Sequence, residues 1–157
     1  MNSPAKVFLA YAHLDARFRF ELEDQLKLLS RKRQMSWWSE HELVPGEDRV
    51  EAIGNALNEA DIILLLISIH FLSNDFCWSE QLQRAIDRHN RGEALVIPIF
   101  VRPCVWEETP VERLQGLPRD GRPVASWTDR HEAWAEVARG IQRAFDGWRA
   151  KDTGSSI

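Results

Sequence analysis

A carboxylate and its amide counterpart stand side by side in the stretch FCWSEQLQRA, as Glu80 and Gln81. A carboxylate in a groove can stabilise a positive charge that develops during a reaction. A glutamine in its place keeps the shape and the hydrogen bonds but loses the charge. Which of the two side chains faces a reactive site therefore decides what that site can do. The competing interpretation of Glu80 is an exposed acid at the start of a helix, where the macrodipole favours it.

The apolar spacing around this pair predicts a helix over residues 77–89. Its inward face is formed by four residues: Trp78, Leu82, Ala85 and Ile86. At about 100° per residue, position 81 lies on the flank of that face and position 80 points nearly opposite. A side chain lining a groove between a helix and a sheet belongs on the flank, so the geometry favours Gln81. A late helix start, with Glu80 in an irregular first turn, would reverse that preference.

The elements that must position this pair alternate between strand and helix along the chain. Strand patterns occur at residues 6–10, 35–38, 62–68, 95–101 and 123–127, and helical patterns at residues 16–32, 50–60, 77–89 and 131–148. The run IILLLIS is apolar without alternation, as a strand buried on both faces of a parallel sheet requires. Asp15 is a candidate N-cap for the first helix, and Pro98 interrupts the fourth strand. The order predicts an α/β fold, a mostly parallel sheet with helices on both faces.

Composition narrows the class of protein. A chain of 157 residues with 44% hydrophobic and 28% charged residues fits one globular domain, which we place at residues 5–147, with a tail or the start of a linker at 148–157. The net charge of −4 gives no basic footprint, so direct nucleic-acid binding is not expected. The absence of a signal peptide and of a long apolar run predicts a cytoplasmic chain that does not enter a membrane. Histidine and cysteine spacing predicts no metal site.

Ligands of open parallel sheets bind beyond the carboxyl ends of the strands. This rule singles out the loops at residues 11–15, 38–48, 68–78 and 102–106. Backbone N–H groups of Tyr11, Ala12 and His13 could meet a phosphate there, although His13 could equally be a solvated turn residue. Trp38 could stack on an aromatic ligand, and a place in the core is about as plausible.

The same loops carry a resemblance to a known family. The segments are VFLAYAHLD at residues 7–15, W-x-E followed by VPGED at 38–48, ADIILLLIS-x-x-FLSNDFCW at 60–78, and VIPIFVRPCVW at 96–106. Together they resemble a bacterial Toll/interleukin-1 receptor (TIR) domain over residues 6–145. Each segment is weak alone, but all four follow one another in the right order and at the right spacing.

The resemblance implies a flavodoxin-like fold with about five parallel strands. It also implies two roles: self-association with other TIR domains as a homo-oligomer or filament, and cleavage of NAD⁺ at the nicotinamide–ribose bond. NAD⁺ is then a substrate, and no cofactor is expected. A sensor domain or subunit as partner and a role in antiviral defence are further implications for a bacterial member. A non-enzymatic scaffold in signalling is the alternative.

The family resemblance also assigns roles in the predicted site. Ser39 and Glu40 begin the loop that in the family closes over substrate or contacts a neighbouring domain, and Glu40, where an acidic residue is usual, could meet a ribose hydroxyl. By position in this sequence, Arg49 is a candidate phosphate or interface contact or a plain surface arginine, Ser68 at the end of a buried strand can point into the groove, and Trp78 walls the groove or packs in the core. Tyr11, Ala12 and His13 lie in the family's substrate loop.

For the catalytic glutamate of the family, two matches remain open. Reading from the left, Phe76-Cys77-x-x-Glu80 matches the family's aromatic-Cys-x-x-Glu pattern and makes Glu80 catalytic. Reading from the right, the family glutamate is followed by an aliphatic residue and x-Arg-Ala-aliphatic, and the run QLQRAI places Gln81 at that position. In the second case the essential acid is replaced by an amide.

Overall fold

A computed structural model describes the backbone of residues 3–155 and the side chains of residues 3–151. Its centre is a parallel sheet of four strands: β1 (Ala5–Ala10), β2 (Met35–Ser39), β3 (Ile62–Ile67) and β4 (Leu95–Phe100). The strand order is β2-β1-β3-β4, with Phe8 of β1 opposite Trp38 of β2 and Ile63 of β3. This arrangement confirms the predicted flavodoxin-like α/β fold.

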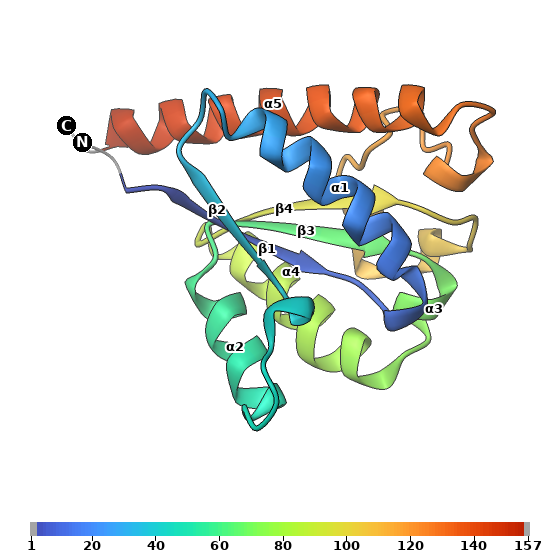
Figure 1. Cartoon of the computed structure of the whole chain (residues 1–157), viewed down its shortest axis with the longest axis horizontal. Coiled ribbons are helices and arrows are strands. Elements are labelled where there is room, and N and C mark those ends of the chain that lie inside the picture. Colours follow the sequence, from blue (N-terminus) through green and yellow to red (C-terminus); the bar gives the residue numbers. More distant parts are fainter. Residues whose placement is uncertain (1–2, 156–157) are drawn as a thin grey trace.

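Helices cover both faces of the sheet (Figure 1). On one face lie α1 (Ala16–Leu29) and α5 (Arg130–Ser155), and on the other lie α2 (Arg49–Glu59) and α4 (Gln83–Asn90). A short helix, α3 (Ile69–Leu72), follows the carboxyl end of β3. All six residues of β3 are buried, and they alternate between the two resulting cores, as the unbroken apolar run requires. No helix in the described residues is long and apolar enough to cross a membrane.

The predicted fifth strand at residues 123–127 is wrong. Residues Val124–Ser126 form a 3₁₀ turn instead, and the place beside β4 is taken by one residue, Leu117, which bridges to Ile99. Leu117 N–H donates to Pro98 O, and its carbonyl accepts from Phe100 N–H, both at 2.8 Å. A single bridge forms because prolines limit the donors of this segment, which contains both Pro118 and Pro123.

Pro98 lies within β4 rather than interrupting it. The N–H groups of Leu95 and Val101 point toward β3 and donate to Asp61 O, just before it, and to Ile67 O, at its end. The nitrogens of the alternate residues, Pro98 among them, therefore face the outer edge. A proline is tolerated there because the edge of a sheet needs no further ladder bond.

Helix ends also differ from the predictions. Helix α1 ends at Leu29, three residues early, and α5 continues through residue 148 to Ser155. Asp15 precedes α1 but makes no capping hydrogen bond, because its carboxylate is used elsewhere. The predicted helix at residues 77–89 divides into a π-helical turn, Cys77–Leu82, and the regular helix α4.

Candidate functional site

A buried carboxylate joins three loops at the carboxyl edge of the sheet. Asp15 follows β1 and is fully buried. It accepts a short hydrogen bond from the hydroxyl of Ser68, at the end of β3, and a 2.6 Å bond from Nε of Arg102, after β4. The Ser68 oxygen also accepts from Phe71 N–H and so caps α3. These contacts fix the relative positions of the loops in which ligands of this fold bind.

The loop after β2 is held against the π-helical turn. Glu40 Oε1 accepts a 2.7 Å hydrogen bond from Nε of Arg49 and forms an ion pair with Nη2 at 2.6 Å. The Arg49 guanidinium lies 5.1 Å from the ring centre of Phe76. Ser39 is buried, and its hydroxyl oxygen accepts from His41 N–H. Glu40 and Arg49 therefore neutralise each other beside the aromatic residue that precedes the turn.

A π-helical turn spans the junction of the two motif matches. Gln83 N–H donates to Trp78 O, five residues earlier, where an α-helix would use the residue four earlier. Such a turn holds one more residue than an α-helix does over the same height, and π turns are frequent at functional sites. The aromatic-Cys-x-x-Glu match ends at Glu80 and the QLQRAI match begins at Gln81, so the junction of the two matches lies within this turn.

The turn gives Glu80 and Gln81 opposite surroundings. Gln81 is 2% exposed, together with the buried neighbours Cys77 and Leu82. Its amide makes no side-chain hydrogen bond to any residue within 3–151. The Glu80 side chain is 44% exposed and pairs with Arg84 at 3.3 Å. Position 81 is inward and position 80 outward, as the helical geometry favours. This holds although Glu80 lies in an irregular first turn and the regular helix α4 begins only at Gln83, the condition that was expected to reverse the preference.

The remaining predicted residues are distributed around this region. Tyr11 is half-buried, burial raises its pKa, and the Arg19 guanidinium lies 5.5 Å from its ring centre. Ala12 is buried, whereas His13 is exposed in a 3₁₀ turn. Trp38 stacks on Phe8 with 5.7 Å between ring centres, and Trp78 is partly buried against the same core. Both tryptophans thus have packing partners.

Sequence reasoning missed Asp15 and Arg102 as partners in the site. Asp15 was assigned to a helix cap, the commonest use of an aspartate before an apolar helical pattern. Their positions in the sequence could have indicated the contact, because the two residues follow β1 and β4 and so lie at the same edge of the sheet. Opposite charges meet there although 87 residues separate them in the sequence.

Cysteine and metal chemistry have little support in this region. Burial, with a contribution from the Glu40 carboxylate, raises the pKa of Cys77 to about 11. Burial likewise raises the pKa of Cys104. Neither thiol is therefore a ready nucleophile at neutral pH. Among the described residues, no three histidine, cysteine or acidic side chains gather closely enough to hold a metal ion.

Comparison with known proteins identifies the family. The sequence model of the TIR domain matches residues 7–139, which is most of the chain. This chain belongs to the TIR-domain family. A curated relative of this TIR domain, the uncharacterized protein y4lF of Sinorhizobium fredii, is 42% identical over 138 residues. That match covers 88% of the present chain but 43% of the relative, so the chain spans less than half of the relative's length.

Solved TIR domains share the fold at low identity. The TIR domain of the Toll-related receptor TRR-2 from Hydra magnipapillata has a TM-score of 0.56 at 23% identity, covering 87% of this chain and 97% of the receptor domain. The TIR domains of the activated Roq1 resistosome, which recognises the pathogen effector XopQ, have a TM-score of 0.53 at 20% identity, covering 86% and 84%. At these identities the likeness shows the architecture alone.

Proposed function

We propose that this TIR domain binds NAD⁺ between the loop after β2 and the π-helical turn, with Gln81 at the position of the family's catalytic glutamate. The observation that carries the proposal is the contrast within the turn. Gln81 is directed inward and is 2% exposed, whereas Glu80 is directed outward to Arg84. The inward amide can donate and accept hydrogen bonds, so it can bind a ligand hydroxyl.

The amide has a predictable chemical consequence. Breaking the nicotinamide–ribose bond builds positive charge on the ribose, as glycoside cleavage does, and an adjacent carboxylate stabilises that charge. Gln81 can hydrogen-bond a ribose hydroxyl but contributes no negative charge. We therefore propose that the chain binds NAD⁺ and cleaves it slowly while Gln81 is inward and Glu80 is outward.

The extra residue of the π turn offers a second route to a carboxylate. Deleting Gln81 would remove one residue from Cys77–Leu82 and favour a continuous α-helix. Glu80 would then directly precede LQRAI, so both family matches would converge on it. Substitution of Gln81 by glutamate and deletion of Gln81 are thus two different ways to place an acid at one position.

Surrounding groups fit the same ligand. The backbone after β1, at residues 11–13, lies at the edge of the sheet where a diphosphate is expected in this fold. Arg49, the first residue of α2 after this loop, is held by Glu40 beside Phe76. If a ligand phosphate replaced the Glu40 carboxylate as the partner of Arg49, Glu40 would be free to accept a hydrogen bond from a ribose hydroxyl.

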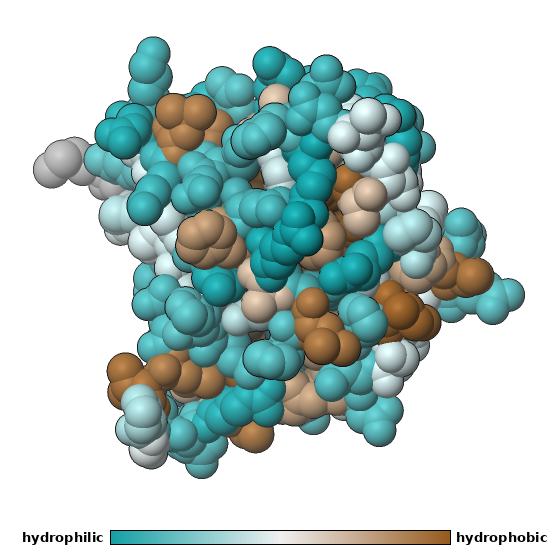
Figure 2. All heavy atoms as spheres, turned by 45° about the vertical axis from the view of Figure 1, so that its right-hand side comes forward, coloured by the Kyte–Doolittle hydropathy of each residue, from teal (hydrophilic) through white to brown (hydrophobic). Residues whose placement is uncertain are grey.

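A scaffold that acts through contacts with other TIR domains is the second candidate. The observation that favours a scaffold is exposed apolar surface at the loop after β2. Val44 in this loop is 59% exposed, and Val50, at the start of α2, is 57% exposed. Figure 2 shows exposed apolar side chains in small areas separated by polar ones. Light scattering over a range of protein concentrations, with Val44→Asp and Val50→Asp for comparison, tests self-association directly.

Titration calorimetry with NAD⁺ tests the binding proposal. We expect saturable binding by the chain, a loss of at least tenfold in affinity for Gln81→Leu, and a change below twofold for the matched variant Glu80→Gln. Gln81→Leu makes the buried position apolar at a similar side-chain volume, so we expect folding to be preserved. Absence of NAD⁺ binding, or equal effects of both substitutions, would contradict the proposal.

A further inference from the structure

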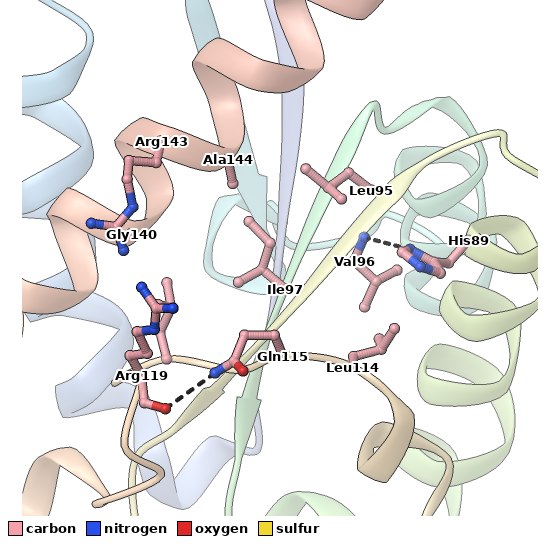
Figure 3. Close-up of a pocket in the computed structure, with 11 residues that line it drawn as sticks. His89, Leu95, Val96, Ile97, Leu114, Gln115, Arg119, Gly140, Arg143 and Ala144 are labelled. Carbon is pink, nitrogen blue, oxygen red and sulfur yellow. Dashed lines mark hydrogen bonds between the residues drawn. The ribbon is translucent and has the colours of Figure 1, made fainter.

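A second hollow lies away from the candidate NAD⁺ groove, beside the amino-terminal half of edge strand β4. Its volume is about 430 Å³, within the range of small-molecule sites. Its walls come from β4, the end of α4, the loop at residues 114–119 and helix α5 (Figure 3). The lining is mainly aliphatic: Leu95, Val96, Ile97, Leu114, Leu117 and Ala144.

Two glycines allow the wall of this pocket to pack closely. A Cβ atom at Gly140 of α5 would lie 2.3 Å from Cδ2 of Leu117, and one at Gly116 would lie 2.4 Å from the Phe100 ring. The loop can approach both the helix and the strand this closely only because neither residue has a side chain. The pocket is therefore bounded by close-packed contacts rather than by a loosely placed loop.

Two guanidiniums lie at one side of the apolar lining. Arg119 and Arg143 are directed to the α5 side of the pocket, opposite His89, as Figure 3 shows. Neither side chain has an acidic or hydrogen-bonding partner among residues 3–151. Gln115 is already engaged, since its amide nitrogen donates to the carbonyls of Gly116 and Arg119. The pocket thus combines an apolar wall with two exposed guanidinium groups, and the Glu136 carboxylate nearby accepts from the backbone N–H of Arg119 at 3.2 Å.

The edge of β4 is not available to an added strand. Val96 N–H donates to Nδ1 of His89 at 3.1 Å, Phe100 N–H is used by Leu117, and Pro98 has no N–H. A peptide that binds by extending the sheet needs these donors. The ligand class that the pocket suits is therefore a small molecule rather than an extended peptide.

We propose that this pocket binds a small amphipathic carboxylate, with the apolar body against Leu95 and Ile97 and the carboxylate between Arg119 and Arg143. Guanidinium is the side chain that best matches a planar carboxylate, and the aliphatic lining removes a short alkyl chain from water. The charged end lies toward solvent, so the carboxylate keeps part of its hydration.

Octanoate is a suitable probe, and 1-octanol is its uncharged counterpart. In an amide NMR titration in low-salt buffer, we expect saturable shifts for Gly140 and Ala144 with octanoate and binding at least tenfold weaker for 1-octanol. Arg143→Gln should weaken octanoate binding about tenfold, the loss expected for one charge-assisted contact. Arg139→Gln removes the same charge from α5 outside the pocket lining and should change affinity less than twofold.

A steric variant supplies an independent test. Ala144→Phe places a ring in the partly exposed pocket wall and should abolish the octanoate shifts, while the amide spectrum of the sheet confirms folding. No saturable octanoate binding, equal affinity for 1-octanol, or equal losses from Arg139→Gln and Arg143→Gln would each overturn the proposal. Unchanged octanoate binding by folded Ala144→Phe would also overturn it.

Discussion

The network of Asp15, Ser68 and Arg102 gives the sharpest stability prediction. Asp15 is fully buried, whereas the Arg102 side chain is 38% exposed. Removing Arg102 leaves a buried carboxylate with the Ser68 hydroxyl as its remaining side-chain donor. Loss of one partner of a buried pair costs roughly 3–5 kcal/mol, and solvent screening at Arg102 places this case at the lower end, about 3 kcal/mol for Arg102→Gln.

Asp15→Asn should cost less than Arg102→Gln. The amide keeps the side-chain volume and escapes the desolvation of a buried charge, but it loses charge-assisted bonds from Ser68 and Arg102. We expect a loss of about 2 kcal/mol in the free energy of unfolding. Because the Arg102 penalty arises from the unpaired charge, the double variant should lose little more than Asp15→Asn alone.

Urea unfolding followed by tryptophan fluorescence measures these differences, since the chain contains seven tryptophans. Arg91→Gln, which removes an exposed partner of Asp87, serves as the control and should cost about 0.5 kcal/mol or less. A loss below about 1 kcal/mol for Arg102→Gln, or additive losses in the double variant, would refute the account of an interdependent buried pair.

Two further stability predictions follow from close contacts and burial. Gly116→Ala should lower the free energy of unfolding by about 2 kcal/mol because its Cβ would meet the Phe100 ring. Gly147→Ala in α5 meets nothing within 4 Å and should raise the free energy of unfolding by about 0.5–1 kcal/mol. Thermal unfolding checks both, since the two variants should shift Tm in opposite directions. Burial raises the pKa of Cys77 in the folded state from 9.0 to about 11, so the unfolded chain loses its proton first and stability falls as pH rises between those values. Cys77→Ala should make that fall smaller, by roughly 1–2 kcal/mol, in urea titrations at pH 8 and pH 10.5; an identical pH dependence would contradict it.

Much of the fold is readable from local pattern. The unbroken apolar run of β3 and the three- and four-residue spacing of α1 identify elements whose burial is dictated by their own residues. The predicted fifth strand fails because its place is decided by a distant contact. Leu117 reaches β4 where Gly116 and Gly140 permit close packing, and no local pattern at residues 123–127 reports this.

The candidate site, like the fold, was predictable from the sequence only in part. Helical geometry placed position 81 on the flank of the inward face and position 80 nearly opposite, and in the structure Gln81 is buried and Glu80 exposed. An irregular first turn was considered as the exception, but its π-helical form was not predicted, because an extra residue in a helix leaves the apolar residues on either side in acceptable spacing. Asp15 was assigned to a cap for a related reason: its partner Arg102 is brought near by the sheet, not by the sequence around it.

Nicotinamide release from NAD⁺ at high protein concentration tests the central claim most directly. The unsubstituted chain should release nicotinamide slowly, and both Gln81→Glu and deletion of Gln81 should accelerate release by at least a hundredfold, equivalent to about 2.7 kcal/mol of transition-state stabilisation. Glu80→Gln should leave the slow rate unchanged. Rapid release by the unsubstituted chain that Glu80→Gln abolishes would instead make Glu80 the catalytic carboxylate and contradict the assignment of Gln81.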